Sequence, residues 1–371
     1  MTTWPRSKRN GAVDQLAAEG VGLWLDDYHR GWLTGGSLER LVADGLVSGI
    51  VSRPAAVARV ISGTTAYRDQ LNELSTAAAS AEERVYALIA EDARAACTAL
   101  EPVFRATKGM HGWVSLGIAP RLVADAKAMV DYSRRLAEMV DRPNVLIRIP
   151  VASRGLTAAG DLLAHRVGVH VTSVFSVQRY AQAVDTYFRS LERATADGHA
   201  ASAVTSLVSL DIGHLNASVD ALLDGSADPC AIALRGQAGV ATARLVYHRY
   251  EESLGCAHWR SLVADGARPQ RLLWTSENAP ESARTALDRV ERLIAWMTLH
   301  ALPRAAFEAL VRREGFRGDT LSGEHGSAGQ VMEALGRAGI VIDSLARDLE
   351  AAAVERERAA WDELLTAVQE G

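Results

Sequence analysis

The sequence predicts an α/β fold, a (β/α)8 TIM barrel with additional helices, on three observations. Short apolar runs alternate with amphipathic stretches from residue 21 onward, which is the pattern of βα units and a parallel sheet. Eight of these runs are candidate strands, the number found in such barrels. The length of 371 residues suits one barrel, and no linker-like or low-complexity stretch separates a second domain.

The first half of the chain contains four of the candidate strands. The first ends in a pair of aspartates, and the helical pattern that follows at residues 38–46 has Ser37 as a possible N-cap. Helical periodicity from residue 81 to 107 separates the second strand from the third. The four predicted strands are residues 21–25, 49–51, 113–116 and 145–149.

The second half continues the alternation. A long helical pattern at residues 177–194 follows the fifth strand, and further helices are predicted at 215–223 and 231–252. The chain ends in helices between residues 340 and 369. The four predicted strands of this half are residues 168–175, 203–208, 271–275 and 293–299.

One charged residue interrupts the fourth predicted strand. Residues 145–149 are rich in branched apolar side chains, as in a strand that is buried on both faces, except for Arg148. A buried charge is costly unless it is paired or faces a ligand. Arg148 is therefore either half of a buried ion pair or part of a functional site.

Composition excludes several classes of function. The chain is 48% apolar with a net charge of −5, which predicts a soluble protein with a sizeable core. Its arginines are interspersed with acidic residues, so no nucleic-acid partner is expected. The N-terminus lacks an apolar signal core and no stretch is long enough for a membrane span, so we expect no membrane association and a cytoplasmic location.

The cysteines and histidines give no sign of a metal site or a bound cofactor. Cys97, Cys230 and Cys256 are far apart and lack the spacing of metal ligands, so we expect reduced, buried thiols. The histidines show neither an H-x-x-x-H pattern nor a pairing with cysteine. The glycine pairs near residues 20–22 and 35–36 do not open a helix after a strand, which argues against a nucleotide. The prediction is therefore no metal and no cofactor.

Several motifs, in order along the chain, resemble those of the transaldolase family. Residues 22–27 are similar to the family's first-strand S-I-W-L-D-D, and residues 61–67 to I-S-G-S-x-x-Y. Residues 170–180 follow N-V-T-L-I-F-S-x-x-x-Y, and residues 267–274 follow A-R-P-Q-R-x-L-W. Residues 361–365 match the C-terminal W-x-x-L-L. This resemblance covers nearly the whole length and implies a single transaldolase-like barrel domain over residues 1–371.

The resemblance also implies that two catalytic groups of the family are replaced. The family's fourth strand reads K-I-P-A-T-x-E-G, and its lysine forms a Schiff base with a ketose phosphate; Arg148 stands at that position. A guanidinium is neither deprotonated nor nucleophilic at neutral pH. Gly117 stands where the family has the glutamate that activates water, whereas Asp26 matches the family's general acid/base.

Residues at the C-terminal ends of the strands, which form the mouth of such a barrel, make up the predicted site. The predicted catalytic residues are Asp26, Arg148 and His170, and the predicted substrate-binding residues are Arg53, Thr172, Ser176 and His300. Histidines exchange protons near neutral pH and arginines bind carboxylate or phosphate, so the expected partner is a small anionic molecule. The alternative is that Arg148 pairs with Asp26 in an inactive site. The sequence leaves the oligomeric state open.

Three functions follow, and the sequence leaves open whether the chain is an enzyme. The first is a repurposed transaldolase-like enzyme that performs an acid/base step on a small anionic or sugar-derived substrate, with Asp26 and His170 as proton-transfer groups. The second is a non-catalytic binding or scaffolding protein on the same fold, suggested by the small or apolar side chains of Gly117, Ala119 and Leu210. The least favoured is ordinary transaldolase activity.

Overall fold

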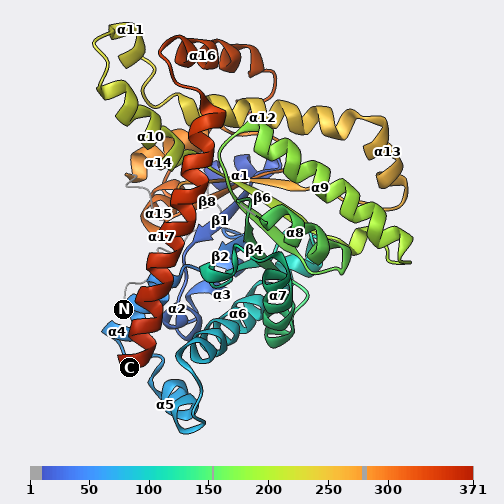
Figure 1. Ribbon diagram of the computed structural model, residues 1–371, viewed down its shortest axis with the longest axis vertical. Coiled ribbons are helices and arrows are strands. Elements are labelled where there is room, and N and C mark those ends of the chain that lie inside the picture. The colour runs from blue at the N-terminus through green and yellow to red at the C-terminus, as the bar shows by residue number, and fades with distance from the viewer. Residues whose placement is uncertain (1–10, 153, 278–281, 371) are drawn as a thin grey trace.

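A closed barrel of eight parallel strands forms the centre of the computed structural model, which describes residues 11–152, 154–277 and 282–370 (Figure 1). Each strand pairs with the next in sequence, and β8 pairs with β1 to close the barrel. The predicted (β/α)8 fold is therefore confirmed. The strands are β1 (Gly22–Asp26), β2 (Gly49–Val51), β3 (Trp113–Gly117), β4 (Val145–Pro150), β5 (Val169–Val174), β6 (Ser206–Asp211), β7 (Arg271–Thr275) and β8 (Thr298–Leu302).

Helices surround the barrel, as the ribbon in Figure 1 shows. They are α1 (Gly11–Ala18), α2 (Arg30–Thr34), α3 (Ser37–Ala43), α4 (Pro54–Gly63), α5 (Arg68–Thr76), α6 (Ala81–Ala106), η1 (Pro120–Leu122), α7 (Ala126–Val140), α8 (Gly155–Ala164), α9 (Val177–Ala196), η2 (Ala201–Ala203), α10 (Ile212–Asp224), α11 (Pro229–Ile232), α12 (Ala238–Gly255), α13 (Ala257–Ala264), α14 (Ala283–Arg292), α15 (Arg304–Val311), α16 (His325–Arg337) and α17 (Ile342–Glu370).

Apolar side chains fill both faces of the strands. The barrel interior holds a cluster formed by Trp24, Val51, Trp113, Leu146, Leu207, Leu273, Leu299 and Ala301. The opposite faces of the strands pack against the helices in a larger core. This two-sided burial is the reason that the strands read as apolar runs rather than as alternating patterns. A polar side chain on one of these strands is therefore buried, and its burial is costly unless it has a hydrogen-bond or ion-pair partner.

Two predicted strands and one predicted cap are misplaced. The sixth strand was predicted at residues 203–208, but the chain first forms η2 and the strand begins at Ser206. The eighth was predicted at residues 293–299, but it begins at Thr298. Its first three residues, Leu293, Ile294 and Ala295, are fully buried but pair with no strand, so their apolar pattern is that of a buried connection. Ser37 is the first residue of α3, and Gly36 is the N-cap.

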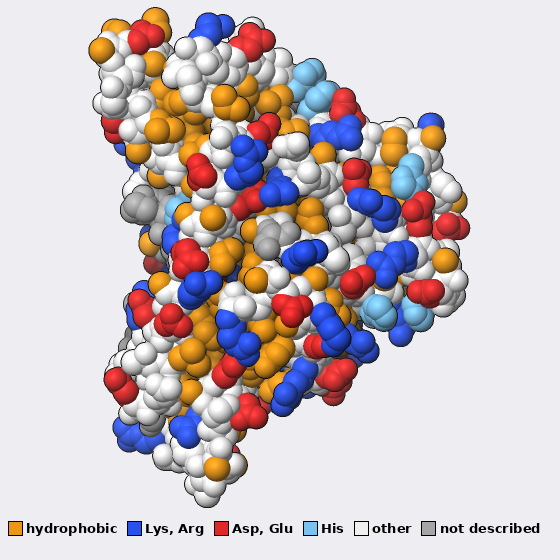
Figure 2. Space-filling view, in the orientation of Figure 1, with side chains coloured by type: hydrophobic (Ala, Val, Ile, Leu, Met, Phe, Trp, Pro, Cys, Tyr) orange, Lys and Arg blue, Asp and Glu red, His pale blue; other side chains and the backbone are white. Residues whose placement is uncertain are grey.

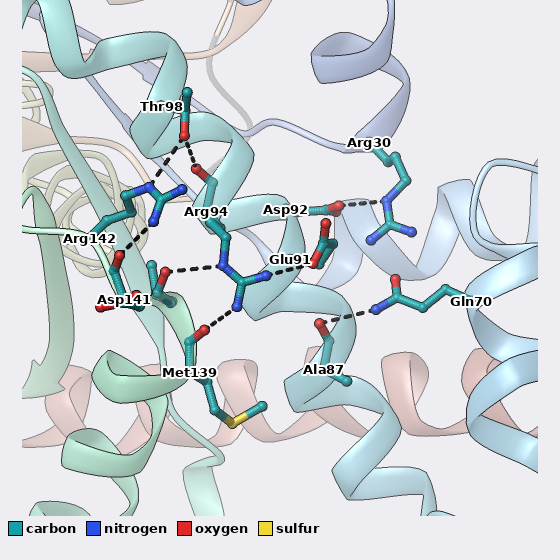
Figure 3. Close-up of polar contacts among 11 residues, drawn as sticks. Arg30, Gln70, Ala87, Glu91, Asp92, Arg94, Thr98, Met139, Asp141 and Arg142 are labelled. Atoms are coloured by element: carbon teal, nitrogen blue, oxygen red, sulfur yellow. Dashed lines mark hydrogen bonds and ion pairs between the residues drawn. The ribbon is translucent and has the colours of Figure 1, made fainter. Parts of the chain in front are cut away.

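The long helix α6 is fixed to its neighbours by buried and partly buried polar contacts, which Figure 3 shows. Asp92 forms an ion pair of 2.6 Å with Arg30, the first residue of α2. Arg94 donates hydrogen bonds to the carbonyl groups of Met139 and Val140 at the end of α7. These bonds connect helices from three successive βα units, so they hold the outer layer around the first half of the barrel.

The C-terminal helix α17 runs along one side of the molecule and is red in Figure 1. It packs against α4, α6, α10, η1 and β5. Near its start, Glu350 accepts two hydrogen bonds of 2.7 and 2.6 Å from Arg179 of α9. Near its end, the ring of Trp361 lies 5.6 Å from that of Tyr86. These contacts place the middle of α17 beside the C-terminal end of the barrel.

Charged side chains of both signs are mixed on the surface (Figure 2). Basic and acidic side chains are interspersed over the face in Figure 2, with no large area of one charge. None of the helices in the described ranges combines the length and apolar character needed to cross a membrane. Cys97 is buried as predicted, whereas Cys256 is half-buried and Cys230 is exposed, so the prediction of buried thiols is wrong for Cys230.

Candidate active site

The mouth of the barrel brings several of the predicted residues together because the strands are parallel and end at one rim. Asp26 is the last residue of β1, and Arg53, two residues after the end of β2, occupies the N-cap position of α4. Arg148 and Thr172 lie near the ends of β4 and β5, where the two strands are neighbours. All four side chains are buried.

Arg53 is the centre of a group of acidic side chains. Its Nε donates a hydrogen bond of 2.7 Å to Oδ1 of Asp26. Its Nη1 lies 3.4 Å from Oε2 of Glu277, which follows β7, and 3.8 Å from Oε1 of Glu357 on α17. Although burial opposes a charge here, Asp26 and then Glu277 and Glu357 raise the pKa of Arg53 well above its usual value. Arg53 is therefore a permanent buried cation.

Arg148 faces the same carboxylate of α17. Its Nη2 lies 3.7 Å from Oε2 of Glu357. Within the described ranges, its ion pair is with Glu357, and Asp26 is bound instead by Arg53. The alternative in which Arg148 pairs with Asp26 is therefore not what the structure shows. Glu357 therefore lies within ion-pair distance of both arginines, whereas Asp26 pairs with Arg53.

Gly117 at the end of β3 is what makes room for Arg148. A Cβ atom at this position would lie 2.7 Å from Nη2 of Arg148, closer than real Cβ contacts. β3 and β4 also pair Gly117 with Arg148 directly. The guanidinium group of Arg148 thus occupies the space that a side chain at position 117 would fill.

A small cavity of about 40 Å³ opens at this point of the mouth. That is space for a few water molecules. Its lining residues come from β3, β4, β5, η1, α17 and the segment after β7: Gly117, Ile118, Pro120, Val123, Arg148, Pro150, Thr172, Ser173, Glu277, Ala353, Val354 and Glu357. Of the seven predicted site residues, Arg148 and Thr172 line it.

His170 lies next to Arg148 across the β4–β5 pair, in the barrel interior. Its Nδ1 is 2.8 Å from Oγ of Ser115, and its ring meets that of Trp24 edge-on at 6.3 Å. Burial and then the charges of Arg148 and Arg53 lower the pKa of His170 well below its usual value. The imidazole is therefore neutral, and its buried Nε2 has no hydrogen-bond partner among the described residues.

The end of β5 is irregular where it borders the cavity. The register with β6 shifts between Val171 and Val174, and Ser173 has a positive φ of 61°. Such a bulge re-aims side chains and is common next to functional sites, where the local strain is balanced by the surrounding structure. Here it allows both Thr172 and Ser173 to line the cavity.

Ser176 and His300 are not brought into this group. The hydroxyl of Ser176 accepts a hydrogen bond from the backbone N–H of Arg179 and caps α9. His300 lies between two strand residues that belong to the interior cluster, so it points outward, and its Nε2 is 3.2 Å from the carbonyl of Leu293. Burial and then Arg289 lower the pKa of His300 to about 3. Both roles are structural in this geometry.

Three acidic residues at the mouth, Glu277, Glu357 and Asp211, were missed from the sequence. Glu277 lies in a segment whose pattern resembles no strand or helix, and Glu357 belongs to a helix face that reads as solvated. Asp211, the last residue of β6, accepts a hydrogen bond of 2.7 Å from Nδ1 of His214. Burial raises the pKa of Asp211, and Glu277 adds to this effect. Asp211 was missed because it lies three residues beyond the end of the predicted sixth strand, 203–208, whereas the strand itself extends to Asp211.

Asp27, the neighbour of Asp26, combines backbone strain with an unusual acidity. Its φ is 104°, and its carboxylate lies 3.4 Å from Nη2 of the exposed Arg59. Burial, with Asp26 adding to it, raises the pKa of Asp27 to about 7. This carboxyl group can therefore exchange a proton at physiological pH. In the described parts of the chain, no three His, Cys, Asp or Glu side chains are grouped so as to hold a metal ion.

Comparison with known proteins agrees with the barrel and its motifs. Residues 23–368 match a family model described as Transaldolase/Fructose-6-phosphate aldolase. The chain belongs to this family. Curated members named transaldolase include one from Acidothermus cellulolyticus, 37% identical over 95% of both chains. Another, from Thermobifida fusca, is 36% identical over 96% of this chain and 97% of its own. The family match thus runs from β1 into α17.

Proposed function

We propose that this member of the transaldolase family binds a small anionic or sugar-derived molecule at the barrel mouth and moves a proton on it without forming a Schiff base. The observation that carries the proposal is the guanidinium of Arg148, which faces the cavity where the family resemblance places the amine. A guanidinium stabilises negative charge but does not attack a carbonyl group. The chain's three lysines are Lys8, Lys108 and Lys127. Lys127 is exposed on α7, and Lys108 precedes β3 at the opposite end of the barrel.

The proposed chemistry is enolisation. A base removes a proton from the carbon next to the substrate carbonyl, and the electron pair of the C–H bond moves to give an enolate oxygen. Arg148 stabilises that oxygen, with Arg53 behind it. His170 is the proposed base, because its neutral ring has a buried Nε2 without a hydrogen-bond partner in the described ranges. Asp26 is the second proposed proton-transfer group. Return of the proton completes the cycle.

The test is deuterium exchange, because it needs no knowledge of the product. The protein is incubated in D2O with ketose phosphates and small 2-keto acids, and deuterium uptake next to the carbonyl is measured by NMR. We expect uptake with at least one compound, and a loss of about 100-fold or more in His170→Ala and Arg148→Ala. Arg105→Ala is the matched control, because Arg105 is exposed and pairs with Glu101 on its own helix.

Borohydride trapping separates this function from ordinary transaldolase activity. Fructose 6-phosphate and borohydride should leave the mass of the wild-type protein unchanged, because neither of the lysines in the described ranges, Lys108 and Lys127, lies at the mouth. A covalent adduct that survives digestion and maps to the barrel would refute the proposal.

A second function, binding without catalysis, is supported by a different observation. The charged groups of the mouth already satisfy one another in part, as Arg53 binds Asp26 and Arg148 faces Glu357, and the cavity is small. A compound that stabilises the protein in a thermal-shift assay, but shows no deuterium uptake, would favour this function.

A further inference from the structure

Helix α17 places a carboxylate of the protein itself between the two guanidinium groups of the mouth. Oε1 of Glu357 is 3.8 Å from Nη1 of Arg53, and Oε2 is 3.7 Å from Nη2 of Arg148. Both distances are within the range of an ion pair but longer than a hydrogen bond. The side chain of Glu357 is 31% exposed, whereas those of the two arginines are 5% exposed. Glu357 therefore approaches both cations from the solvent side.

The two arginines have donors that this arrangement leaves unused. Nη1 of Arg53 and Nη1 of Arg148 are buried, and neither donates a hydrogen bond within the described part of the chain, although Oε2 of Glu277 lies 3.4 Å from Nη1 of Arg53. A buried donor without an acceptor costs about 1–3 kcal/mol. An oxyanion that entered between the two guanidinium groups would supply the missing acceptors at hydrogen-bond distance.

We infer that Glu357 is an internal competitor for an anion subsite formed by Arg53 and Arg148, and that an anionic ligand binds there by displacing its carboxylate. The inference rests on the proposed function, in that it assigns the position of the anionic group of the ligand. It also makes Glu357 a specificity-determining residue on a helix far from the barrel strands in sequence.

The displacement does not require α17 to leave the barrel. Glu350 and Trp361 anchor the helix on either side of Glu357 through Arg179 and Tyr86. Glu357 has a long side chain with three rotatable bonds, and it already borders solvent. Rotation of this one side chain is therefore enough to open the subsite.

The charges at the mouth determine which anions can compete. Asp26, Glu277 and Glu357 provide three carboxylates against the guanidinium groups of Arg53 and Arg148. A singly charged anion only replaces one carboxylate by another. A dianion interacts twice as strongly with both guanidinium groups at the same distance. The subsite consequently selects dianions, such as a phosphate monoester or a dicarboxylate, over monoanions.

The experiment is calorimetric titration of the full-length protein with sulfate and with acetate. We expect sulfate to bind wild type at least tenfold more tightly than acetate. We expect Glu357→Gln and Glu357→Ala each to bind sulfate about tenfold more tightly than wild type, because the competitor is removed. Glu355→Gln is the matched control, since Glu355 lies on the same helix, is 63% exposed and pairs with Arg358. Its sulfate affinity should equal that of wild type.

The possible results separate the two proposals. Suppose that both Glu357 variants have a wild-type circular dichroism spectrum but bind sulfate no more tightly than wild type does. That result would overturn the inference that Glu357 competes with the anion. Equal binding of sulfate and acetate would overturn the selection of dianions. If none of the proteins binds sulfate, the anion subsite is wrong, while deuterium exchange still reports independently on proton transfer.

Discussion

Gly117 and Arg148 form a pair whose coupling can be measured. A methyl group at Gly117 would lie 2.7 Å from the guanidinium, so Gly117→Ala should destabilise the protein by about 1–3 kcal/mol through overpacking. The cost should fall by at least 1 kcal/mol in the Arg148→Lys background, because the shorter ammonium leaves space. Urea denaturation of the four proteins in the cycle gives both values.

Gly329 supplies the control for this cycle. It lies in α16 with open space around its Cα, so Gly329→Ala should stabilise the protein by roughly 0.5–1 kcal/mol in either background. An equal cost of Gly117→Ala with arginine and with lysine at position 148 would show that the two residues are independent.

Asp27 should make stability depend on pH in a defined direction. Its pKa of about 7 in the folded protein lies above the unfolded value near 3.9, so the folded state holds an extra proton between these pH values. Stability due to this group is therefore present below about pH 4 and is lost as the pH rises to about 7. Asp27→Asn should remove this loss and be more stable than wild type at pH 8 by about 2 kcal/mol, after allowing for solvent screening.

The measurement is urea denaturation at pH 4.5 and pH 8. The difference between Asp27→Asn and wild type should grow with pH, whereas that for Asp362→Asn, at an exposed position on α17, should stay constant. A difference that is constant for Asp27→Asn would mean that Asp27 titrates normally.

At the scale of single residues, sequence reasoning located groups on strands better than groups that reach the mouth from elsewhere. Arg148 and Thr172 were found because their strand positions fix where they point. Glu277 and Glu357 were missed because their position depends on the path of a loop and of the last helix, which no local pattern encodes. His300 points away from the mouth because it lies within β8 between the inward-facing Leu299 and Ala301, whereas the predicted strand ended at residue 299.

Helix α17 depends on one ion pair near its start. Glu350 is 5% exposed and accepts both hydrogen bonds from Arg179, so Glu350→Ala leaves a partly buried guanidinium without its partner. We expect the free energy of unfolding, measured by urea denaturation, to fall by about 2–3 kcal/mol. We also expect amide hydrogen exchange to be faster in α17 than in α9.

The matched variant is Asp131→Ala, which breaks an exposed pair with Lys127 on α7. It should cost less than about 0.5 kcal/mol. Similar losses in the two variants would show that α17 is held by its apolar contacts alone.

At the scale of elements, strand order and most strand positions followed from apolar runs bounded by turns. β6 and β8 did not, because apolar residues before them are buried without pairing in the ladder. Before β6, Ala201 and Val204 are at most 1% exposed, although the two residues between them are exposed. Before β8, Leu293, Ile294 and Ala295 are fully buried outside any helix or strand. Hydrophobicity reports burial, and in this molecule the ends of the barrel are covered as well as its sides.

The barrel as a whole is closed at its opposite end by a buried arginine. Arg271 of β7 donates to the carbonyl groups of Met110, Met297 and Thr298, which belong to the approaches to β3 and β8. Burial lowers its pKa to about 10. Arg271→Leu should destabilise the protein by about 3–5 kcal/mol, because these buried carbonyls lose their donor. Guanidinium denaturation measures the change, and Arg105→Ala, at an exposed position, should cost under about 0.5 kcal/mol.

The pairing of β8 with β1 also has a consequence during synthesis of the protein on the ribosome. β1 is made near residue 22, but its second neighbour is complete only at residue 302. At a synthesis rate of about 5–20 residues per second, one edge of β1 stays unpaired for tens of seconds while the chain grows. An open strand edge is a template for pairing with other chains. The nascent polypeptide is therefore most prone to aggregation just before β8 emerges, and a chaperone that shields the edge of β1 would act in that interval.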